Sequence, residues 1–136
     1  MFEFLEKISI DEKDVKMMNP LLWAYIGDSI YEIYVRSYII SKGGKTSFDL
    51  HRESIKYVKA SAQSDILEVI MDKLSEEEQN IIRRGRNTKT YHIPKNAKVI
   101  DYKRATAFEA LIGYLYLLKR YDRLDEIMSF IFEGVK

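Results

Sequence analysis

The sequence WAYIGDSIYE, residues 23–32, places two acids inside an otherwise apolar segment. On a helix, Asp28, Glu32 and Arg36 follow one another at four-residue spacing and form one polar stripe. Burying a carboxylate without a partner costs several kcal/mol, so these acids need a counter-charge or a metal ion. Glu32 can pair with Arg36. Gly27 costs a helix about 1 kcal/mol relative to Ala and therefore indicates close approach of another backbone or a ligand beside Asp28.

The sequence TAFEALIGY, residues 106–114, contains a single acid in a second apolar segment. Glu109 has only apolar neighbours there, so it also needs a partner if it is buried. If Asp28 and Glu109 face each other across a helix pair, their oxygens form a site suited to a hard cation such as Mg²⁺. The alternative is that Glu109 pairs with a lysine or an arginine.

Charge is distributed unevenly along the 136 residues, although 22 Lys and Arg against 21 Asp and Glu give a formal net charge of only +1. The segment from Arg83 to Arg104 contains eight basic residues and one acid, a net charge of +7, so the rest of the chain carries −6. Such a segment fits a polyanionic partner, because Lys and Arg neutralise phosphates without reading bases. The alternative is a solvated loop without a partner.

Composition excludes several classes of site and protein. The chain has no cysteine, which excludes disulfides, thiolate metal sites and cysteine nucleophiles, and two histidines do not suffice for a histidine-rich zinc site. The N-terminus lacks the pattern of a secretory signal. Segment 21–40 is apolar, but its three charged residues would be costly in lipid. We therefore expect a buried helix in a cytoplasmic protein without a membrane partner.

Helical periodicity dominates the sequence and predicts one all-α domain, residues 1–136, of six or seven helices. Its signals are an Asn19-Pro20 start, a Gly43-Gly44 stop, a Ser-x-x-Glu capping box at Ser75 and a stop at Gly85. Asp101 and Asp122 can cap the last two helices, and Ser47 an earlier one. The expected helices are 2–8, 20–42, 47–58, 61–74, 76–84, 102–120 and 123–132. Residues 86–100 read as a long loop, which is usually functional or disordered.

At these residues the sequence resembles a known family. Residues 25–32, YIGDSIYE, resemble the signature helix of ribonuclease III, and residues 108–113, FEALIG, resemble its second catalytic helix. The closer resemblance is to Mini-ribonuclease III, the short bacterial form without a double-stranded-RNA-binding domain. Stretches 24–36, 49–51, 83–89, 94–96 and 106–117 support it, and the resemblance covers residues 19–118.

The resemblance implies a ribonuclease III-like catalytic domain that cleaves double-stranded RNA with Mg²⁺, or Mn²⁺ as a substitute, and matures 23S ribosomal RNA. Asp28 and Glu109 match the metal-binding catalytic acids. Full-length ribonuclease III has two further acids, where this chain has Ala24 and Thr106. Water must then fill more of the coordination shell, and one or two metal ions per site remain possible.

Cutting both strands of a duplex requires two sites, which a homodimer with two-fold symmetry supplies. Trp23, Tyr25 and Ile26, beside Asp28, are candidates for packing across the dyad or for ordinary core positions. A ribosomal protein is a further candidate partner.

A basic loop, about residues 83–100, is expected to contact RNA mainly by shape. The expected contacts with phosphates and the groove are Arg84, Arg86, Asn87, Lys89, Lys95 and Lys98, and Glu32, Lys59 and Gln63 are candidates for supporting roles. The alternative function is a non-catalytic RNA-binding or ribosome-associated module of the same fold, which the missing acids favour. A helical protein-interaction domain would leave the basic segment unexplained.

Overall fold

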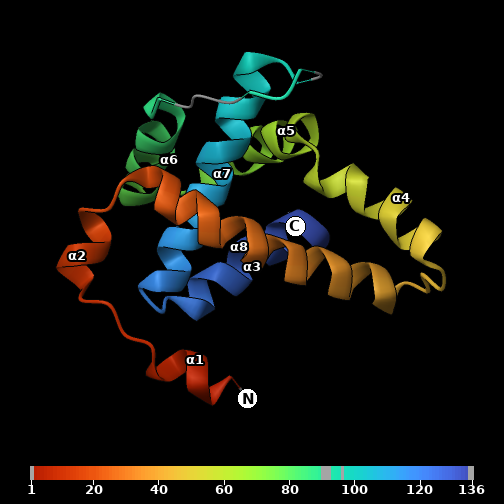
Figure 1. Cartoon of the computed structure of the whole chain (residues 1–136), viewed down its shortest axis with the longest axis horizontal. Helices are drawn as coiled ribbons and strands as arrows, with labels where there is room; N and C mark the ends of the chain where they lie inside the picture. The colour runs from red at the N-terminus through yellow and green to blue at the C-terminus, as the bar shows by residue number, and fades with distance from the viewer. Residues whose placement is uncertain (1, 90–92, 96, 135–136) are drawn as a thin grey trace.

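A computed structural model describes residues 2–89, 93–95 and 97–134 and confirms the all-α prediction (Figure 1). Within these ranges the chain forms eight α-helices and one 3-10 turn, without a strand. They are α1 Glu3–Lys7, α2 Glu12–Lys16, α3 Pro20–Ser41, α4 Ser47–Val58, α5 Ala60–Ile70, η1 Met71–Lys73, α6 Glu76–Asn87, α7 Val99–Leu117 and α8 Tyr121–Phe132. Helix α2 was not expected from the sequence. None of the described helices combines the length and apolar character that crossing a membrane requires.

Helix α7 is the centre of the fold. Nearly every residue from Ala105 to Leu115 is buried, and α3, α5 and α6 pack around this segment. Figure 1 shows α3 crossing in front of α7, with α6 and α5 on opposite sides. The hydrophobicity on all sides of α7 therefore reflects burial by three neighbouring helices. Because three helices pack around α7, its backbone holds side chains such as Glu109 in a defined position.

Two glycines bring the backbones of α3 and α7 into contact. A Cβ atom on Gly27 would collide with the carbonyl oxygen of Glu109, and a Cβ on Gly113 would collide with the carbonyl of Trp23. The close approach that Gly27 indicates in the sequence is therefore an approach of the α7 backbone. Because Asp28 follows Gly27 directly, the crossing also brings Asp28 next to Glu109.

The capping signals define several helix starts. The side chain of Asn19 accepts a hydrogen bond from the backbone N–H of Leu21 at the start of α3. Ser75 and Glu78 form the reciprocal capping box that the sequence predicts at the start of α6. Thr46, one residue before the expected Ser47, caps α4 through the N–H of Asp49.

Three predicted boundaries are wrong, at Gly85, Asp101 and Asp122. Helix α6 continues through Gly85 to Asn87, since Gly85 packs against α7, where an added Cβ would lie 2.9 Å from the Cα of Ala107. Helix α7 begins at Val99, so Asp101 lies in its first turn and does not cap it. Likewise, Asp122 lies in the first turn of α8.

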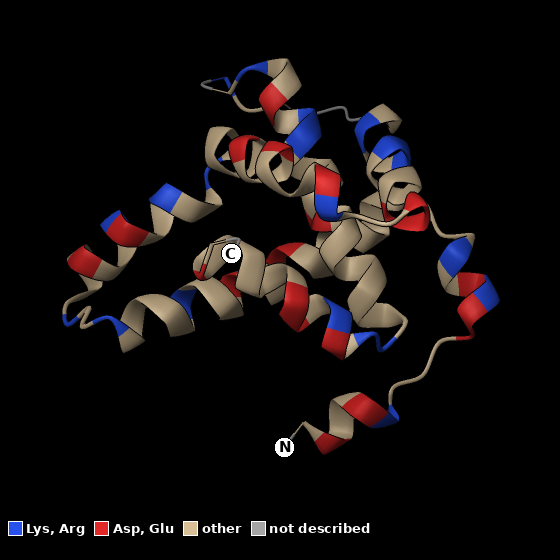
Figure 2. Ribbon diagram, turned by 180° about the vertical axis from the view of Figure 1, so that it is seen from behind, with Lys and Arg blue, Asp and Glu red and all other residues tan. Residues whose placement is uncertain are grey.

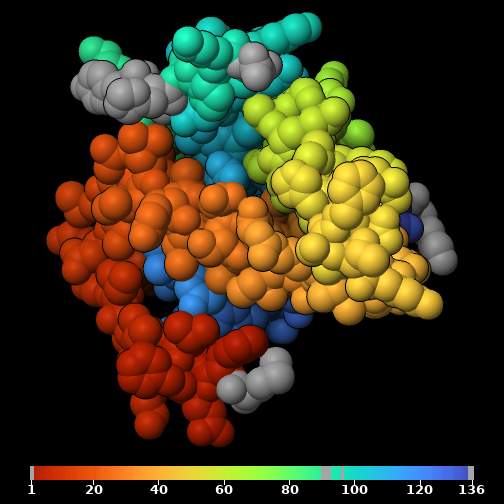
Figure 3. Space-filling model, turned by 45° about the vertical axis from the view of Figure 1, so that its right-hand side comes forward, coloured from red at the N-terminus to blue at the C-terminus, as the bar shows by residue number. Residues whose placement is uncertain are grey.

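The remaining elements lie at the edges of the molecule. Helices α3 and α4 diverge from the core and form the two sides of an extension (Figure 1), and α4 projects on one face in the space-filling view (Figure 3). The N-terminal segment with α1 and α2 lies at another edge (Figure 3), and α1 has no buried residue.

Candidate active site

The structure brings Asp28 and Glu109 together at the crossing of α3 and α7. Asp28 is exposed, whereas most of the Glu109 side chain is covered. Burial and the hydrogen-bonding contact with the Asp28 carboxyl raise the pKa of Glu109 to about 8, although a hydrogen bond from Gln63 acts in the opposite direction. Two carboxyls this close cannot both ionise readily without added positive charge.

No lysine or arginine in the described part of the chain forms an ion pair with either carboxyl group. The counter-charge alternative for Glu109 therefore has no support among these residues. Nor do the described residues contain a group of three or more His, Cys, Asp or Glu side chains that could hold a metal ion. The donor set is two carboxylates, which suits a hard divalent cation that keeps several water ligands.

Gln63 is a neutral polar side chain that forms a hydrogen bond with Glu109. Its Nε2 donates to the carbonyl oxygen of Val58 at 2.8 Å and to Oε2 of Glu109 at 3.4 Å. Its Oε1 receives no hydrogen bond from any described residue. An unpartnered acceptor beside two carboxylates is consistent with a hydrated cation, whose water ligands are hydrogen-bond donors.

Full-length ribonuclease III has further acids at two positions that are occupied here by Ala24 and Thr106. Ala24 is buried in the core. Thr106 is also buried, and its hydroxyl donates to the carbonyl oxygen of Tyr102 one turn earlier at 3.0 Å. The site is therefore poor in carboxylates, as the sequence indicates.

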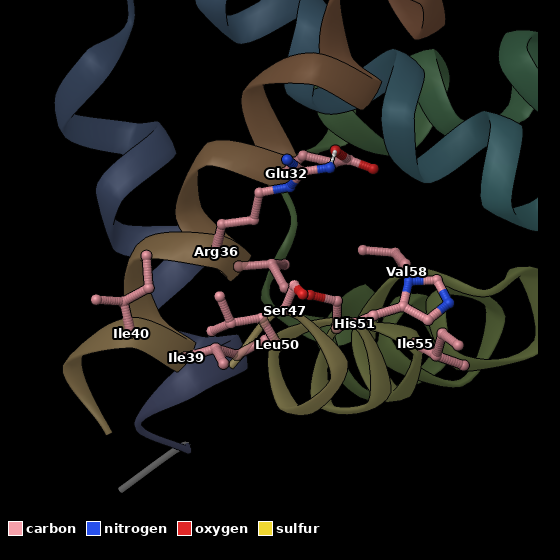
Figure 4. A pocket seen from close by; sticks show the side chains of 11 residues that line it. Glu32, Arg36, Ile39, Ile40, Ser47, Leu50, His51, Ile55 and Val58 are labelled. Atoms are coloured by element: carbon pink, nitrogen blue, oxygen red, sulfur yellow. Dashed lines mark ion pairs between the residues drawn. The ribbon is translucent and has the colours of Figure 1, made fainter. Parts of the chain in front are cut away.

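Glu32 forms an ion pair with Arg36 at 2.8 Å, as the local alternative predicts. Both residues line a groove of about 490 Å³ between α3 and α4. Figure 4 shows the pair on the α3 side and His51, Ile55 and Val58 on the α4 side. Glu32 still contributes to the raised pKa of Glu109, as the last of several causes. It is thus an electrostatic neighbour of the pair.

A cleft of about 530 Å³ opens beside Glu109. One wall is the junction of α4 and α5 with Lys59 and Gln63, and the other includes Lys98 at the start of α7. The cleft therefore joins two segments that are far apart in the sequence, residues 58–63 and residues 94–109. Its described lining is Val58, Lys59, Ala60, Ser61, Gln63, Pro94, Ala97, Lys98, Asp101, Tyr102, Ala105, Thr106 and Glu109.

Tyr102 is a lining residue that the sequence interpretation missed. It lies seven residues before Glu109, and Thr106 lies between them at helical spacing. The expected helix 102–120 includes Tyr102, so the same periodicity places it on the face of Glu109 and would have identified it.

Most of the predicted RNA-contacting side chains are exposed. They surround the end of α6 and the segment that leads to α7, where basic residues gather (Figure 2). The exposed members are Arg86, Asn87, Lys89, Lys95 and Lys98.

Arg84 differs from its neighbours. Its guanidinium donates to the carbonyl oxygens of Lys16 at 3.1 Å and Met18 at 3.5 Å. It also lies over the ring of Trp23, 4.7 Å from the centroid. These contacts tie α6 to the segment between α2 and α3 and favour a structural role over contact with RNA.

Trp23 is a core residue, which corrects its prediction as a dimer contact. Its side chain is 0% exposed, its Nε1 donates to the carbonyl oxygen of Val15 at 2.9 Å, and its ring meets Tyr114 edge-on. Tyr25, by contrast, is 80% exposed, and Ile26 is half-buried. Only these two of the three candidates remain available to a partner.

Comparisons with known proteins agree with this geometry. The Ribonuclease III domain family matches residues 22–120. A Mini-ribonuclease 3 from Clostridium tetani is 51% identical over 121 residues, which cover 88% of this chain and 80% of that protein. A Mini-ribonuclease 3 from Thermoanaerobacter sp. is 45% identical over 130 residues, which cover 95% of this chain and 92% of that protein. A crystal structure of a protein from Fusobacterium nucleatum has a TM-score of 0.78 and 35% identity, and the match covers 89% of this chain and 97% of that one.

Proposed function

The chain belongs to the ribonuclease III family, in its Mini-ribonuclease 3 branch, and is an endoribonuclease. From this premise we propose that it cleaves double-stranded RNA with Mg²⁺ held by Asp28 and Glu109. The observation that carries the proposal is the meeting of these two carboxyls at the α3–α7 crossing, without a basic partner among the described residues. Mn²⁺ is expected to substitute, because it accepts the same oxygen ligands.

Asp28, Glu109 and the residues around them would have different roles in phosphodiester hydrolysis. Asp28 and Glu109 hold the cation, and Gln63 donates a hydrogen bond to Glu109. A cation held there would supply positive charge for a phosphate oxygen and would lower the pKa of the attacking water. Lys59 and Lys98 line the same cleft, and their charges would neutralise phosphates of a bound RNA strand. The products are a 5′-phosphate and a 3′-hydroxyl.

The basic loop supports a duplex substrate. Arg86, Asn87, Lys89 and Lys95 are exposed, and Pro94, next to Lys95, lines the cleft. Side chains that contact phosphates and ribose hydroxyls recognise the shape of A-form RNA without reading its sequence. We assign these residues to phosphate and groove contacts.

A homodimer would place two such sites on one duplex. The outer face of α3 carries Leu22, Tyr25 and Ile33, which are 54%, 80% and 55% exposed. Large apolar side chains that adjoin on a helix face are typical of an interaction surface. Isologous pairing of this face would relate the two Asp28–Glu109 sites by a two-fold axis, matching the approximate dyad of RNA.

Replacing Glu109 by Gln tests the proposal. The wild-type protein should cleave a perfect RNA duplex in Mg²⁺ and lose this activity in EDTA. Glu109→Gln should abolish cleavage and leave duplex affinity nearly unchanged, because binding depends on the basic residues. Glu76→Gln, at an exposed position of α6, is the matched control and should cleave at the wild-type rate.

The same assay tests the cellular substrate that we propose, the precursor of 23S ribosomal RNA in the cytoplasm. The precursor is offered alone and together with ribosomal proteins, since one of them is a candidate for presenting the duplex. Metal-independent products, or cleavage by Glu109→Gln at the wild-type rate, would refute the assignment of the site. Duplex binding without any cleavage would favour the non-catalytic alternative.

A further inference from the structure

Gln63 links the end of α4 to the Glu109 carboxylate on α7. Its side chain is only 3% exposed. One amide nitrogen serves both partners, the carbonyl oxygen of Val58 at 2.8 Å and Oε2 of Glu109 at 3.4 Å. Because both partners are acceptors, the amide nitrogen must point toward them, and the orientation of the amide is fixed.

The rest of the Gln63 amide does not serve the fold. Its Oε1 is buried and accepts no hydrogen bond from the residues that the structure describes. A buried acceptor without a donor destabilises a protein, and an apolar side chain of similar size would avoid this cost. Packing alone therefore does not explain a glutamine at this position; its amide nitrogen is needed by the Val58 carbonyl and by the Glu109 carboxylate.

This chain has Ala24 and Thr106 where full-length ribonuclease III has acids, so fewer side chains are available to orient Glu109. Ala24 has no polar atom in its side chain, and the Thr106 hydroxyl is used by the carbonyl of Tyr102. Among the described hydrogen bonds, the one from Gln63 is the only one that a side chain donates to Glu109. A neutral donor can restrain this carboxylate without adding charge to the pair.

We propose that Gln63 is a positioning residue, which holds the Glu109 carboxylate in the orientation in which it meets Asp28 and binds the cation. This inference rests on the proposed function, because the orientation of Glu109 matters only if Glu109 is a metal ligand. Gln63 acts through Glu109 and does not itself touch the substrate. Hydrogen-bond partners of metal ligands commonly change metal affinity or activity by about 10- to 100-fold when they are replaced.

Gln63→Leu tests the proposal, with Gln79→Leu as the matched control. The amide of Gln79 also donates to two backbone carbonyls, those of Met71 and Leu74, but these bonds join η1 to α6 and do not reach the site. The measurements are Mn²⁺ affinity by electron paramagnetic resonance, kcat and KM on an RNA duplex, and Tm.

Gln63→Leu should weaken Mn²⁺ binding and lower kcat, each about 10- to 100-fold, with KM unchanged. Its Tm should also fall, because the hydrogen bond to the Val58 carbonyl is lost. Gln79→Leu should lower Tm and leave Mn²⁺ affinity and kcat unchanged. A merely structural Gln63 would give the pattern of Gln79. If Gln63→Leu does not fold, Gln63→Met, which keeps an unbranched side chain, is measured in the same way.

Wild-type Mn²⁺ affinity and kcat in the folded Gln63 variant would overturn the proposal. Glu109→Gln, measured in parallel, separates this failure from that of the proposed function. If Glu109→Gln loses Mn²⁺ binding and cleavage while the Gln63 variant keeps both, only the positioning role is wrong. If Glu109→Gln keeps both, the metal site itself is wrong.

Discussion

Glu78 and Glu109 are both largely covered glutamates, but their pKa values shift in opposite directions. Burial alone would raise the pKa of Glu78, yet hydrogen bonds and charge from Arg123, together with the Ser75 backbone, outweigh burial and lower it. Glu109 has Asp28 as its charged neighbour, so burial and the second carboxyl act together and raise its pKa. The same residue type therefore has an arginine partner in one place and a second carboxyl beside it in the other.

Replacing Glu78 by Gln should make the protein less stable at neutral pH but not in acid. A lowered pKa in the folded state contributes stability above the unfolded-state pKa, near 4.5, and this contribution disappears as pH falls through the folded-state pKa. Losing the hydrogen bonds to a charged partner should reduce the free energy of unfolding by about 2 kcal/mol at pH 7. Urea denaturation of both proteins at pH 7 and pH 3 measures the difference. An equal difference at both pH values would contradict the prediction.

Residue types and spacing predict that Asp28 and Glu109 are neighbours, but they do not predict every residue around this pair. Asp28 and Glu109 stand out because each interrupts an apolar helix, a signal that is local in the sequence. The sequence leaves Trp23 between a dimer contact and a core position and predicts Arg84 as an RNA contact, whereas in the structure the half-buried Arg84 guanidinium lies over the buried Trp23 ring. Their contacts join α2, α3 and α6, and no pattern within one helix reports such a long-range contact. The roles of the site residues remain predictions.

At the scale of elements, the order and type of the long helices follow from periodicity and caps, while their ends depend on packing. Gly85 looks like a stop signal, but it allows α6 to approach α7 and the helix continues. Asp101 looks like a cap, but α7 begins at Val99, three residues earlier than this cap predicts. Gly85 permits close helix packing and Asp101 lies in a first helical turn, and neither role can be read from the local sequence alone. The short α2, whose only buried side chain is Val15, has too weak a periodicity to predict.

Arg84 and Arg86, two residues apart on α6, should give opposite results when each is replaced by Ala. Arg84→Ala removes hydrogen bonds to two backbone carbonyls and the contact with Trp23, so the free energy of unfolding should fall by about 1–2 kcal/mol. Its effect on RNA affinity should be small. Arg86→Ala should leave stability unchanged, weaken duplex binding and reduce the salt slope of binding by about 1.

Urea denaturation and duplex binding at several salt concentrations measure both arginine variants. Each variant is the control for the other, because both lose one positive charge from the same helix. If Arg84→Ala weakens RNA binding as much as Arg86→Ala and leaves stability intact, the structural role of Arg84 is wrong.

At the scale of the whole molecule, charge and apolar surface mark different faces for different partners. Basic side chains gather around the end of α6 and the loop to α7 (Figure 2), whereas the exposed apolar side chains of α3 lie on its outer face. The net charge of +1 hides this division. A polyanion and a second copy of the chain could therefore bind at the same time, as cleavage of two strands requires.

Tyr25→Asp should convert the proposed dimer into monomers. A buried charge opposite its own symmetry mate would be costly, so the dissociation constant should rise at least about 100-fold. Analytical ultracentrifugation measures the mass, and a duplex assay measures the ratio of nicks to double-strand breaks. Val69→Asp, at an exposed apolar position of α5, is the control and should remain dimeric. A monomeric wild-type protein at micromolar concentration would contradict the prediction.

The contact of α3 with α7 at Gly27 and Gly113 has a consequence for how this chain can change. The spacing of the two helices is set there by backbone atoms, which are the same in every sequence, and not by the sizes of side chains. Core side chains elsewhere can then be exchanged during evolution or engineering while Asp28 and Glu109 keep their separation. The backbone contact fixes the distance between the two helices. Gly27 and Gly113 are therefore the two positions at which a larger residue would change that distance.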